Sequence, residues 1–374
     1  MKNCIGIINA GKATHDFKGL CNHRPVYMLP FGGRYRLVDI PISTMVNHGI
    51  RTVAIYTGEK IRSTMDHLAN GKPWDLNRRF NGLFLFPPAE TDYKRGDLAQ
   101  YHSTEEFFNR ASEDYVFITH PHILAKVDLA SIFKEFVDSN SDIGLIYKKV
   151  SDPQAKLINS PKMNIGPDGK LVNIGINLGT ENIFNLYLEM AFVKKEVLMD
   201  LVKTSLEKAD LHSLMDAILE NKDRYNVQTY EHKGHIENIR DVKSYYDANL
   251  NLLKYDISQE LFFHGGQIFT KTKDEPSTIY KEGSDVQNSI LANGCIIEGT
   301  VENSILFRGV KIGKGAVVRN SIIMTKAQID DNAVVVNSIL DKYAHIHQAA
   351  NIVGNKAIPF VVEKSLSIGK ENSI

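Results

Sequence analysis

A short sequence repeat in the C-terminal part of the chain constrains its fold more than any other feature. Past residue 285 the pair Asn-Ser recurs, each time followed by an aliphatic residue, at positions 288–289, 303–304, 320–321 and 337–338. Aliphatic residues also recur six positions apart, in the pairs Ile312 and Val318, Ile329 and Val335, and Ile346 and Ile352. Three such steps give a repeat of about 17 residues, and a short period with one inward aliphatic side chain per step predicts a β-solenoid. The alternative is an ordinary β-sandwich in which this spacing is coincidental.

The first 250 residues have a different pattern, in which short apolar runs alternate with stretches of helical spacing. The expected strands are 4–8, 52–56, 83–86, 115–119 and 143–148, and the expected helices are 37–47, 61–68, 98–110 and 129–136. Strands separated by helices indicate βαβ units and a mostly parallel sheet. Ligand sites in such sheets lie at the carboxyl ends of the strands, so we expect chemistry at residues 9–12 and 120–124.

Chain length and this change of pattern predict two domains, because single cores usually stop growing well before 374 residues. We place an α/β domain at residues 1–253 and a solenoid at 286–374. The segment 254–285, which contains Gly265, Gly266 and Pro276, is the expected linker. Solenoids have open ends and faces that associate unless they are capped or paired, so we expect an oligomer.

Composition excludes several classes of protein. Apolar residues make up 43% and charged residues 24% of the chain, as in ordinary globular proteins. The 44 basic and 44 acidic residues balance, which argues against a nucleic-acid or membrane-surface partner. Cys4, Cys21 and Cys295 show neither a disulfide framework nor metal-ligand spacing. The apolar run near the N-terminus is too short for a signal peptide, so we expect a cytoplasmic protein.

Two phrases carry a family resemblance. Residues 29–43 read LPFGGRYRLVDIPIS, and residues 244–249 read SYYDAN. They resemble phrases of the glucose-1-phosphate adenylyltransferases (ADP-glucose pyrophosphorylases) of bacterial glycogen synthesis, and the resemblance covers essentially the whole chain. It implies a Rossmann-like α/β nucleotidyltransferase domain with a mostly parallel sheet, followed by a left-handed β-helix of hexapeptide repeats. The family is tetrameric, which again implies an oligomer.

The resemblance places the two metal-binding aspartates of the family at positions that are Pro121 and Asn238 in this chain. Proline has no ligand atom in its side chain, and asparagine offers a neutral oxygen, which is a poor ligand for Mg²⁺. His120 and His122 could form a transition-metal pair, but Mg²⁺ prefers oxygen ligands. Among other neighbours, the acids Glu237 and Asp241 are candidates to replace the lost carboxylates. We therefore expect no catalytic residue and no metal site.

The substrate-binding phrases are also altered. The family's glycine-rich triphosphate loop here has Ala10 and Ala13 at glycine positions, His15 at an arginine position, and Asp16 after it. We interpret it as part of a vestigial nucleotide site; the alternative is a plain strand-to-helix turn. The residues of this vestigial site are Asn9, Ala10, Gly11, Lys12, Gly96 and Asp97. The family's E-K-P phrase for the sugar phosphate is absent, and Asn177, Leu178 and Gly179 lie near its place.

Three arginines remain candidates for binding an anion: Arg24, Arg34 and Arg36. The position of Arg36 lies at the effector site between the domains of the family, and a planar guanidinium suits phosphate. The alternative for Arg34 and Arg36 is a structural salt bridge with Asp39 or another carboxylate. Gly32 and Gly33 are expected to form a tight turn.

These observations favour a catalytically impaired or inactive regulatory subunit of glucose-1-phosphate adenylyltransferase. We expect it to form a hetero-oligomer with an active adenylyltransferase subunit and to respond to a phosphorylated metabolite. One alternative is an active enzyme that forms ADP-glucose and pyrophosphate from ATP and glucose 1-phosphate, and only this alternative requires Mg²⁺ and ATP. The other alternative is a stand-alone sensor of a phosphorylated metabolite.

Overall fold

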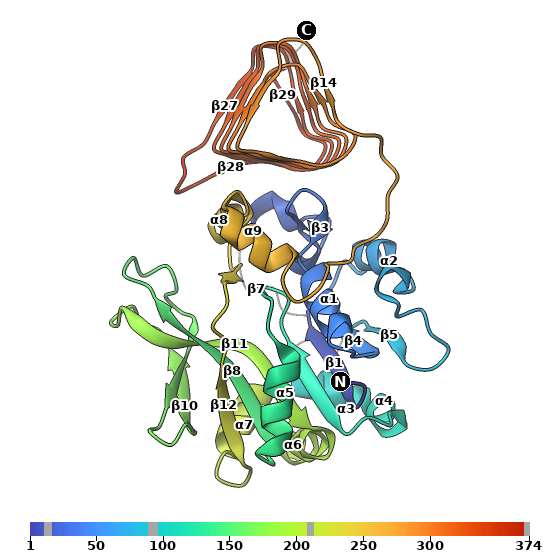
Figure 1. The fold of residues 1–374 in the computed structure, drawn as a ribbon, viewed down its shortest axis with the longest axis vertical. Coiled ribbons are helices and arrows are strands. Elements are labelled where there is room, and N and C mark those ends of the chain that lie inside the picture. The colour runs from blue at the N-terminus through green and yellow to red at the C-terminus, as the bar shows by residue number, and fades with distance from the viewer. Residues whose placement is uncertain (11–16, 89–95, 208–212, 370–374) are drawn as a thin grey trace.

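The computed structural model describes residues 1–10, 17–88, 96–207 and 213–369. An α/β domain and a triangular β-helix are stacked along the long axis of the molecule (Figure 1). Helices α8 (Val242–Asn251) and α9 (Tyr255–Phe262) lie between the β-helix and the large sheet (Figure 1). Every helix in the described ranges is too short or too polar to cross a membrane.

The α/β domain is built on a nine-stranded sheet. Seven strands follow the order β10-β9-β11-β6-β1-β4-β5, and the other two extend it from β11, which pairs with β8, which in turn pairs with β12. Its strands are β1 (Cys4–Asn9), β4 (Thr52–Tyr56), β5 (Gly82–Phe86), β6 (Tyr115–Thr119), β8 (Ile143–Ser151), β9 (Pro161–Ile165), β10 (Leu171–Ile176), β11 (Ile183–Lys194) and β12 (Val227–Glu231). Strand β1 pairs in parallel with β4 and β6, and β4 with β5. Strand β11 pairs antiparallel with β6 and β8. All five expected strands are present.

Helices cover the sheet, with one buried apolar cluster on each side. They are α1 (Asp39–Asn47), α2 (Arg62–Leu68), α3 (Asp97–Ser103), α4 (Glu105–Arg110), α5 (Leu129–Asp138), α6 (Lys195–Glu207) and α7 (Leu214–Glu220). The helix expected at 98–110 is divided into α3 and α4 at Thr104. The hydroxyl of Thr104 donates to the carbonyl of Gln100 at 2.8 Å, a side-chain bond that competes with continuation of the helix.

The solenoid has three parallel sheets, one for each side of the triangle (Figure 1). The first contains β14 (Ile279–Tyr280), β17 (Ile296–Ile297), β20 (Lys311–Ile312), β23 (Gln328–Ile329), β26 (His345–Ile346) and β29 (Ser367–Ile368). The second contains β15 (Asp285–Gln287), β18 (Thr300–Glu302), β21 (Val317–Arg319), β24 (Val334–Val336) and β27 (Asn351–Val353). The third contains β16 (Ile290–Leu291), β19 (Ile305–Leu306), β22 (Ile322–Ile323), β25 (Ser338–Leu340) and β28 (Phe360–Val362). The predicted fold class is confirmed, and the β-sandwich alternative is wrong.

The Asn-Ser pairs form one corner of successive coils. Asn303 and Asn320 have φ values of 48° and 46°, in the left-handed region that asparagine tolerates better than most residues. The hydroxyl oxygen of Ser304 accepts a hydrogen bond from the backbone N–H of Ser321 at 3.0 Å, and that of Ser321 accepts one from Ser338 at 3.2 Å. The repeated pair therefore turns the chain and also links each coil to the next.

The aliphatic residues after the Asn-Ser pairs join the two domains. Ile305, Ile322 and Ile339 are fully buried in one apolar cluster with Phe31 and Tyr245 of the α/β domain. The next residue of each coil faces the solenoid interior instead. The segment expected to be a linker, residues 254–285, contains α9 and β14, and β14 already pairs with β17.

Candidate functional site

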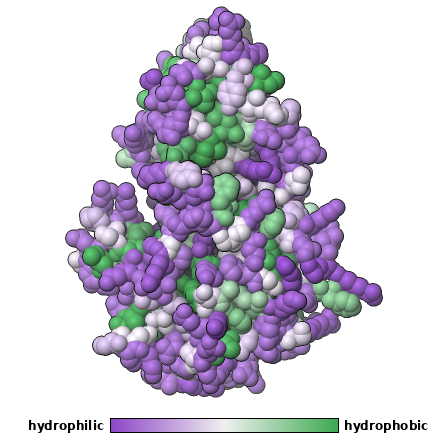
Figure 2. Space-filling model, in the orientation of Figure 1, coloured by the Kyte–Doolittle hydropathy of each residue, from purple (hydrophilic) through white to green (hydrophobic). Residues whose placement is uncertain are grey.

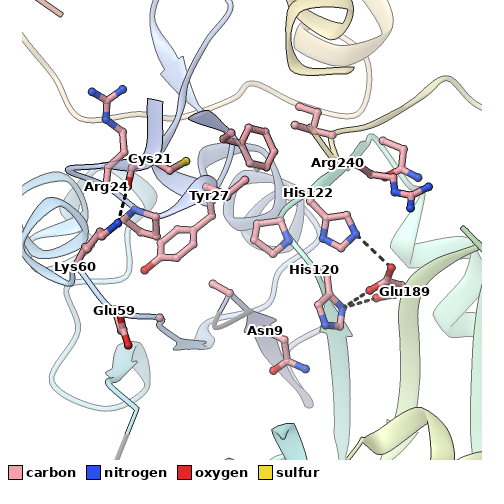
Figure 3. Close-up of a pocket in the computed structure, with 18 of the residues that line it drawn as sticks. Asn9, Cys21, Arg24, Tyr27, Glu59, Lys60, His120, His122, Glu189 and Arg240 are labelled. Atoms are coloured by element: carbon pink, nitrogen blue, oxygen red, sulfur yellow. Dashed lines mark hydrogen bonds and ion pairs between the residues drawn. The ribbon is translucent and has the colours of Figure 1, made fainter. Parts of the chain in front are cut away.

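A cavity of about 590 Å³ opens where strands β1 and β6 end (Figure 3). Its walls also include parts of the segment 17–27, the residues after β4 and the residues around β13 (Ile236–Asn238). Parallel sheets place ligand sites at this edge, and residues from both expected segments line the cavity. The lining includes Asn9, Ala10, His120, Pro121 and His122.

His120, His122 and Glu189 form a polar cluster on one wall of this cavity (Figure 3). Nε2 of His122 lies 3.2 Å from Oε1 of Glu189, and Nδ1 of His120 lies 3.6 Å from Oε2. Burial by itself raises the pKa of Glu189, but the charge and hydrogen bond of His122, with the charges of His120 and Arg240, lower it to about 2. The carboxylate is therefore ionised and held by two imidazole rings.

Sequence reasoning missed Glu189. It sits at an irregularity in the pairing of β11 with β8, between Tyr187 and Met190, and has a φ of 52°. Such a bulge redirects a side chain, here into the cavity, and breaks the simple alternation of a strand. The available signal was a single acid within the apolar run LYLEMAF, since a charged residue in a buried strand needs a partner.

Pro121 and Asn238 both line the cavity. The antiparallel pairing of β13 with β7 (Ile123–Ala125) places Asn238 opposite Ile123, two residues beyond Pro121. Oδ1 of Asn238 is buried and has no hydrogen-bond partner among the described residues. Neither position offers a carboxylate, and Glu189 is already bound by two histidines. Glu59 is the other carboxylate in the described lining. The donors at positions 121 and 238 themselves do not fit Mg²⁺, which requires several oxygen ligands in octahedral geometry.

The acids beside Asn238 are engaged elsewhere. Oε1 of Glu237 accepts a hydrogen bond from Nδ2 of Asn251 at 2.9 Å and lies 2.7 Å from Nε2 of His235. Asp241 caps helix α8, where its Oδ1 accepts from the backbone N–H of Ser244 at 2.7 Å. Neither acid lines the cavity, so neither replaces a lost metal ligand there.

The described part of the expected nucleotide site is hydrogen-bonded within the fold. Nδ2 of Asn9 donates to the hydroxyl of Tyr101 at 2.6 Å, and that hydroxyl donates to Oδ1 of Asn9 at 2.9 Å. The backbone N–H of Ala10 donates to the carbonyl of Tyr56 at 2.9 Å. Gly11 and Lys12 lie outside the described residues. The described polar groups therefore do not form an open phosphate-binding loop.

Gly96 and Asp97 lie at the start of helix α3, and Asp97 lines an adjoining cavity of about 420 Å³ that also contacts Asn9 and His120. Gly96 has a φ of 85°. Oδ1 of Asp97 accepts a hydrogen bond from the backbone N–H of Leu214 at 2.9 Å, and burial raises the pKa of this carboxyl. Asp97 thus links α3 to α7.

The segment expected near the sugar-phosphate site lies beside the first cavity without lining it, because the carbonyl of Asn177 accepts a hydrogen bond at 2.8 Å from the backbone N–H of Asn159, which does line it. Nδ2 of Asn177 donates to the carbonyl of Leu157, and its Oδ1 accepts from the N–H of Gly179, both at 3.0 Å. Leu178 is 73% exposed. Arg240 does line the cavity, and its guanidinium donates to oxygen atoms of Ile158 and Ser160.

A second group of charged side chains lies between the domains: Arg24, Arg36, Lys273 and Lys342, called here the interdomain basic cluster. Nη2 of Arg24 lies 2.8 Å from both carboxylate oxygens of Asp341, which belongs to the β-helix. Figure 3 shows Arg24 pointing away from the first cavity. Arg24 is therefore bound to the second domain.

Arg36 makes no ion pair among the described residues. Its Nη1 donates to the carbonyl of Met28 at 3.3 Å, and only its backbone N–H reaches Asp39, at 3.0 Å. The carboxylate of Asp39 lies 2.6 Å from Nε2 of His67. Burial lowers the pKa of Arg36 to about 10, an effect that Asp39 opposes and Arg24 reinforces. Within the described ranges the Arg36 guanidinium therefore has no salt bridge, although the charge of Asp39 still favours its protonated form.

The pKa of Lys342 is lowered further than that of Arg36, its neighbour in the interdomain basic cluster. Burial, together with the charges of Arg36, Arg24 and Lys273, lowers its pKa to about 7, although Asp341 opposes the shift. Arg34, in contrast, is exposed at the turn formed by Gly32 and Gly33, whose φ values of 58° and 77° confirm a tight turn. Cations held together in this way form a candidate site for an anion.

Comparison with known proteins agrees with this architecture. A nucleotidyl transferase family model matches residues 5–156, and a model described as GlmU-like, C-terminal hexapeptide matches residues 276–357. Glycogen biosynthesis protein GlgD of Bacillus subtilis (strain 168) is 32% identical over 314 residues, which are 83% of this chain and 81% of that protein. The chain belongs to the GlgD family. GlgD of Geobacillus stearothermophilus is 34% identical over 318 residues, covering 84% and 82% of the two chains.

The GlgD family is related to enzymes. Glucose-1-phosphate adenylyltransferase of Bacillus subtilis (strain 168) is 26% identical over 335 residues, which are 85% of this chain and 85% of that protein. The family resemblance carried by residues 29–43 and 244–249 is thereby confirmed. In this GlgD-family chain, the positions expected for the metal aspartates are Pro121 and Asn238, and both line the cavity.

Proposed function

We propose that this GlgD-family chain is a non-catalytic, cytoplasmic regulatory subunit in glycogen biosynthesis. It assembles with an active glucose-1-phosphate adenylyltransferase paralogue and changes the turnover or effector response of that enzyme. One observation carries the proposal: Pro121 and Asn238 line the cavity at the expected metal positions, and neither has a carboxylate. The names of the relatives, GlgD and glucose-1-phosphate adenylyltransferase, support the pathway.

The electrostatics of the cavity support a loss of catalysis. Nucleotidyl transfer requires groups that neutralise the negative charge developing on the transferred phosphate. Here Glu189 adds an ionised carboxylate to the wall. Two cations among the lining residues already have partners in the protein: Arg24 pairs with Asp341, and Nζ of Lys60 donates to the carbonyl of Cys21 in the cavity wall at 2.7 Å.

Exposed apolar side chains support assembly with another subunit. They belong to the last coils of the β-helix. Figure 2 shows apolar patches among hydrophilic residues on the β-helix as a whole. The group comprises Tyr343, Val353, Ile358, Phe360 and Leu366. Val353 and Ile358 are 65% and 69% exposed. Apolar surface of this kind on a solenoid is a candidate for contact with a second chain.

The interdomain basic cluster supports a response to a phosphorylated effector. Burial lowers the pKa of Arg36 in the α/β domain and of Lys342 in the β-helix, and the charge of Arg36 lowers the pKa of Lys342 further, so each cation is disfavoured where it lies. A bound phosphate would neutralise them and stabilise the arrangement of the two domains. This is how an anion at the cluster would bias a conformational equilibrium shared with a partner subunit.

The two alternatives make different predictions. An active enzyme would release pyrophosphate from ATP and glucose 1-phosphate when the purified chain is assayed alone with Mg²⁺. A stand-alone sensor would bind a phosphorylated metabolite and fail to co-purify with the active paralogue. Anion binding at the interdomain basic cluster is expected under both the regulatory and the sensor hypotheses, so it does not distinguish them. Co-purification with the active paralogue does, because only the regulatory hypothesis predicts a complex.

The test is a co-purification experiment. The untagged chain is expressed with a tagged active paralogue, and the complex is isolated through the tag and analysed by size-exclusion chromatography with light scattering. We expect a hetero-oligomer with a fixed ratio of the two chains. The variant Ile358→Glu, on the exposed apolar group, is expected to weaken the complex, whereas Glu106→Gln, on an exposed helix of the other domain, is expected to leave it intact. Elution of the two wild-type chains as separate homo-oligomers would contradict the proposal.

A further inference from the structure

The β-helix carries a group of metal-ligating side chains that lies apart from the cavity and the basic cluster. Asp330 follows strand β23, and His345 and His347 flank the inward-facing Ile346 on the next coil. The register aligns Ile329 with Ile346, so Asp330 and His347 are neighbours across two parallel strands. Both histidines point outward because alternate residues of a strand face the same side.

The three side chains are close together and reachable from solvent. Nε2 of His345 lies 2.8 Å from Oδ2 of Asp330, and Nδ1 of His347 lies 3.5 Å from the same oxygen. The two imidazole rings have centroids 4.1 Å apart. The side chains of Asp330, His345 and His347 are 38%, 32% and 22% exposed. Parallel strands are about 4.8 Å apart, so the fold itself holds the ligand atoms at this spacing.

We propose that Asp330, His345 and His347 form a binding site for a divalent transition-metal ion of the Zn²⁺ class. Neighbouring ligand atoms around a tetrahedral Zn²⁺ lie about 3.3 Å apart, close to both distances from Asp330 Oδ2. Two imidazoles and one carboxylate suit Zn²⁺, Cu²⁺ or Ni²⁺ better than Mg²⁺. Three protein ligands leave a fourth position for water.

One further observation favours an ion over a simple His-Asp ion pair. Nε2 of His347 is buried, so Nδ1, which lies 3.5 Å from Oδ2 of Asp330, is the nitrogen that this ring offers to the ion. Within the described parts of the chain, this is the one group of three His, Cys, Asp or Glu residues whose ligand atoms all lie within 4.8 Å of one another. His120, His122 and Glu189 in the cavity do not meet this condition.

The experiment uses the untagged full chain, treated with a chelator and then titrated with Zn²⁺ by isothermal calorimetry and with Co²⁺ by visible absorption. We expect one tightly bound equivalent with a tetrahedral Co²⁺ spectrum. His347→Gln and His345→Gln should each weaken binding at least about 100-fold, the upper end of the effect of losing an outer partner of a metal ligand. Far-UV circular dichroism checks that the variants stay folded.

Two variants of the other histidines are matched controls. His102→Gln removes an exposed imidazole, 60% accessible, and His120→Gln removes one of the cavity pair. Both should bind Zn²⁺ as the wild type does. The proposal is overturned if the wild type binds no Zn²⁺, or if binding survives in the double variant His345→Gln with His347→Gln. Loss of binding in His120→Gln alone would assign the metal to the cavity instead and would also overturn it.

Discussion

Arg24 of the α/β domain and Asp341 of the β-helix form a buried ion pair across the domain boundary, with Nη2 of Arg24 2.8 Å from both carboxylate oxygens. The two side chains are 4% and 1% exposed. Around them, Ile305, Ile322 and Ile339 of the β-helix pack against the α/β domain. The ion pair therefore joins the two domains through a charged contact within an otherwise apolar interface, and it lies next to Arg36 and Lys342.

Asp341→Asn should destabilise the chain by about 3–5 kcal/mol, because it leaves the Arg24 charge buried without its partner. Replacing both members, as in Arg24→Met with Asp341→Leu, should recover much of this loss. Urea unfolding followed by fluorescence and circular dichroism measures the change. The matched control is Arg319→Met, which removes an exposed pair with Glu302 and should cost less than about 1 kcal/mol. Equal effects of Asp341→Asn and Arg319→Met would contradict this account.

Lys342→Met should stabilise the chain near and below neutral pH, because the pKa of Lys342 is lowered to about 7 in the fold from the ordinary value of 10.5. Between these values the unfolded chain binds the proton and the folded chain does not, so wild-type stability rises with pH by up to about 1.4 kcal/mol per unit. The advantage of the variant should thus be largest below pH 7 and shrink toward pH 10.5. Thermal unfolding across this range measures it, and a constant difference at every pH would refute the linkage.

The same variant tests anion binding. Phosphate should raise the unfolding temperature of the wild type, because an anion at the basic cluster favours the protonated Lys342. It should have a much smaller effect on Lys342→Met. Lys314→Met, on an exposed part of the β-helix, serves as the control and should respond to phosphate as the wild type does. If phosphate raised the unfolding temperature of the wild type, Lys342→Met and Lys314→Met equally, any anion site would lie outside the interdomain basic cluster.

Glu189→Gln should reduce stability at pH 7 by about 1–3 kcal/mol, since the two histidines lose a charged hydrogen-bond partner. The pKa of Glu189 is lowered to about 2 from the ordinary 4.5, so the contribution of the carboxylate is fully present above pH 4.5 and disappears as the pH falls through 2. The wild type and the variant should therefore converge in acid. Urea unfolding at pH 7 and at a pH of about 2 measures this, with Glu106→Gln as an exposed control. A variant as stable as the wild type at pH 7 would be inconsistent with the assigned ion pairs.

Pro121→Asp combined with Asn238→Asp should create an Mg²⁺ site beside Glu189 without restoring efficient turnover. The two new carboxylates supply the missing ligands. Ala10 and Ala13 still stand at glycine positions of the triphosphate loop, where a Cβ crowds the approach of a phosphate to the backbone. Calorimetry with Mg²⁺ and a pyrophosphate-release assay test the two parts. Turnover equal to that of an active paralogue would show that the rest of the cavity is intact.

The fold could be predicted from the sequence because its signals are local and repeated. The Asn-Ser pairs occupy corners, where Asn303 and Asn320 adopt the left-handed conformation that this residue type tolerates. Strand β4 has the predicted bounds, since a fully buried parallel strand reads as a continuous apolar run. The break at Thr104 was not predictable, because it depends on a hydroxyl bond with the preceding turn of helix.

The site could be predicted only in part, because its polar contacts join residues far apart in the chain. Pro121 and Asn238 come to one cavity, but nothing local pairs Arg24 with Asp341, more than 300 positions away. Glu189 was missed because a bulge reverses the direction that strand alternation gives its side chain. The Asp330, His345 and His347 group was missed because the repeat was used to identify the fold and not to align outward-facing side chains of successive coils.

In the proposed function, this chain regulates an active paralogue without catalysing the reaction itself. The most direct measurement is a titration in which a fixed amount of active paralogue receives increasing amounts of this chain, and ADP-glucose formation is followed with and without phosphorylated effectors. We predict no turnover by this chain alone, and a change in rate or effector response that saturates at a fixed ratio of the two chains. Robust Mg²⁺-dependent turnover by this chain alone, or rates that are unchanged at every ratio, would contradict the account.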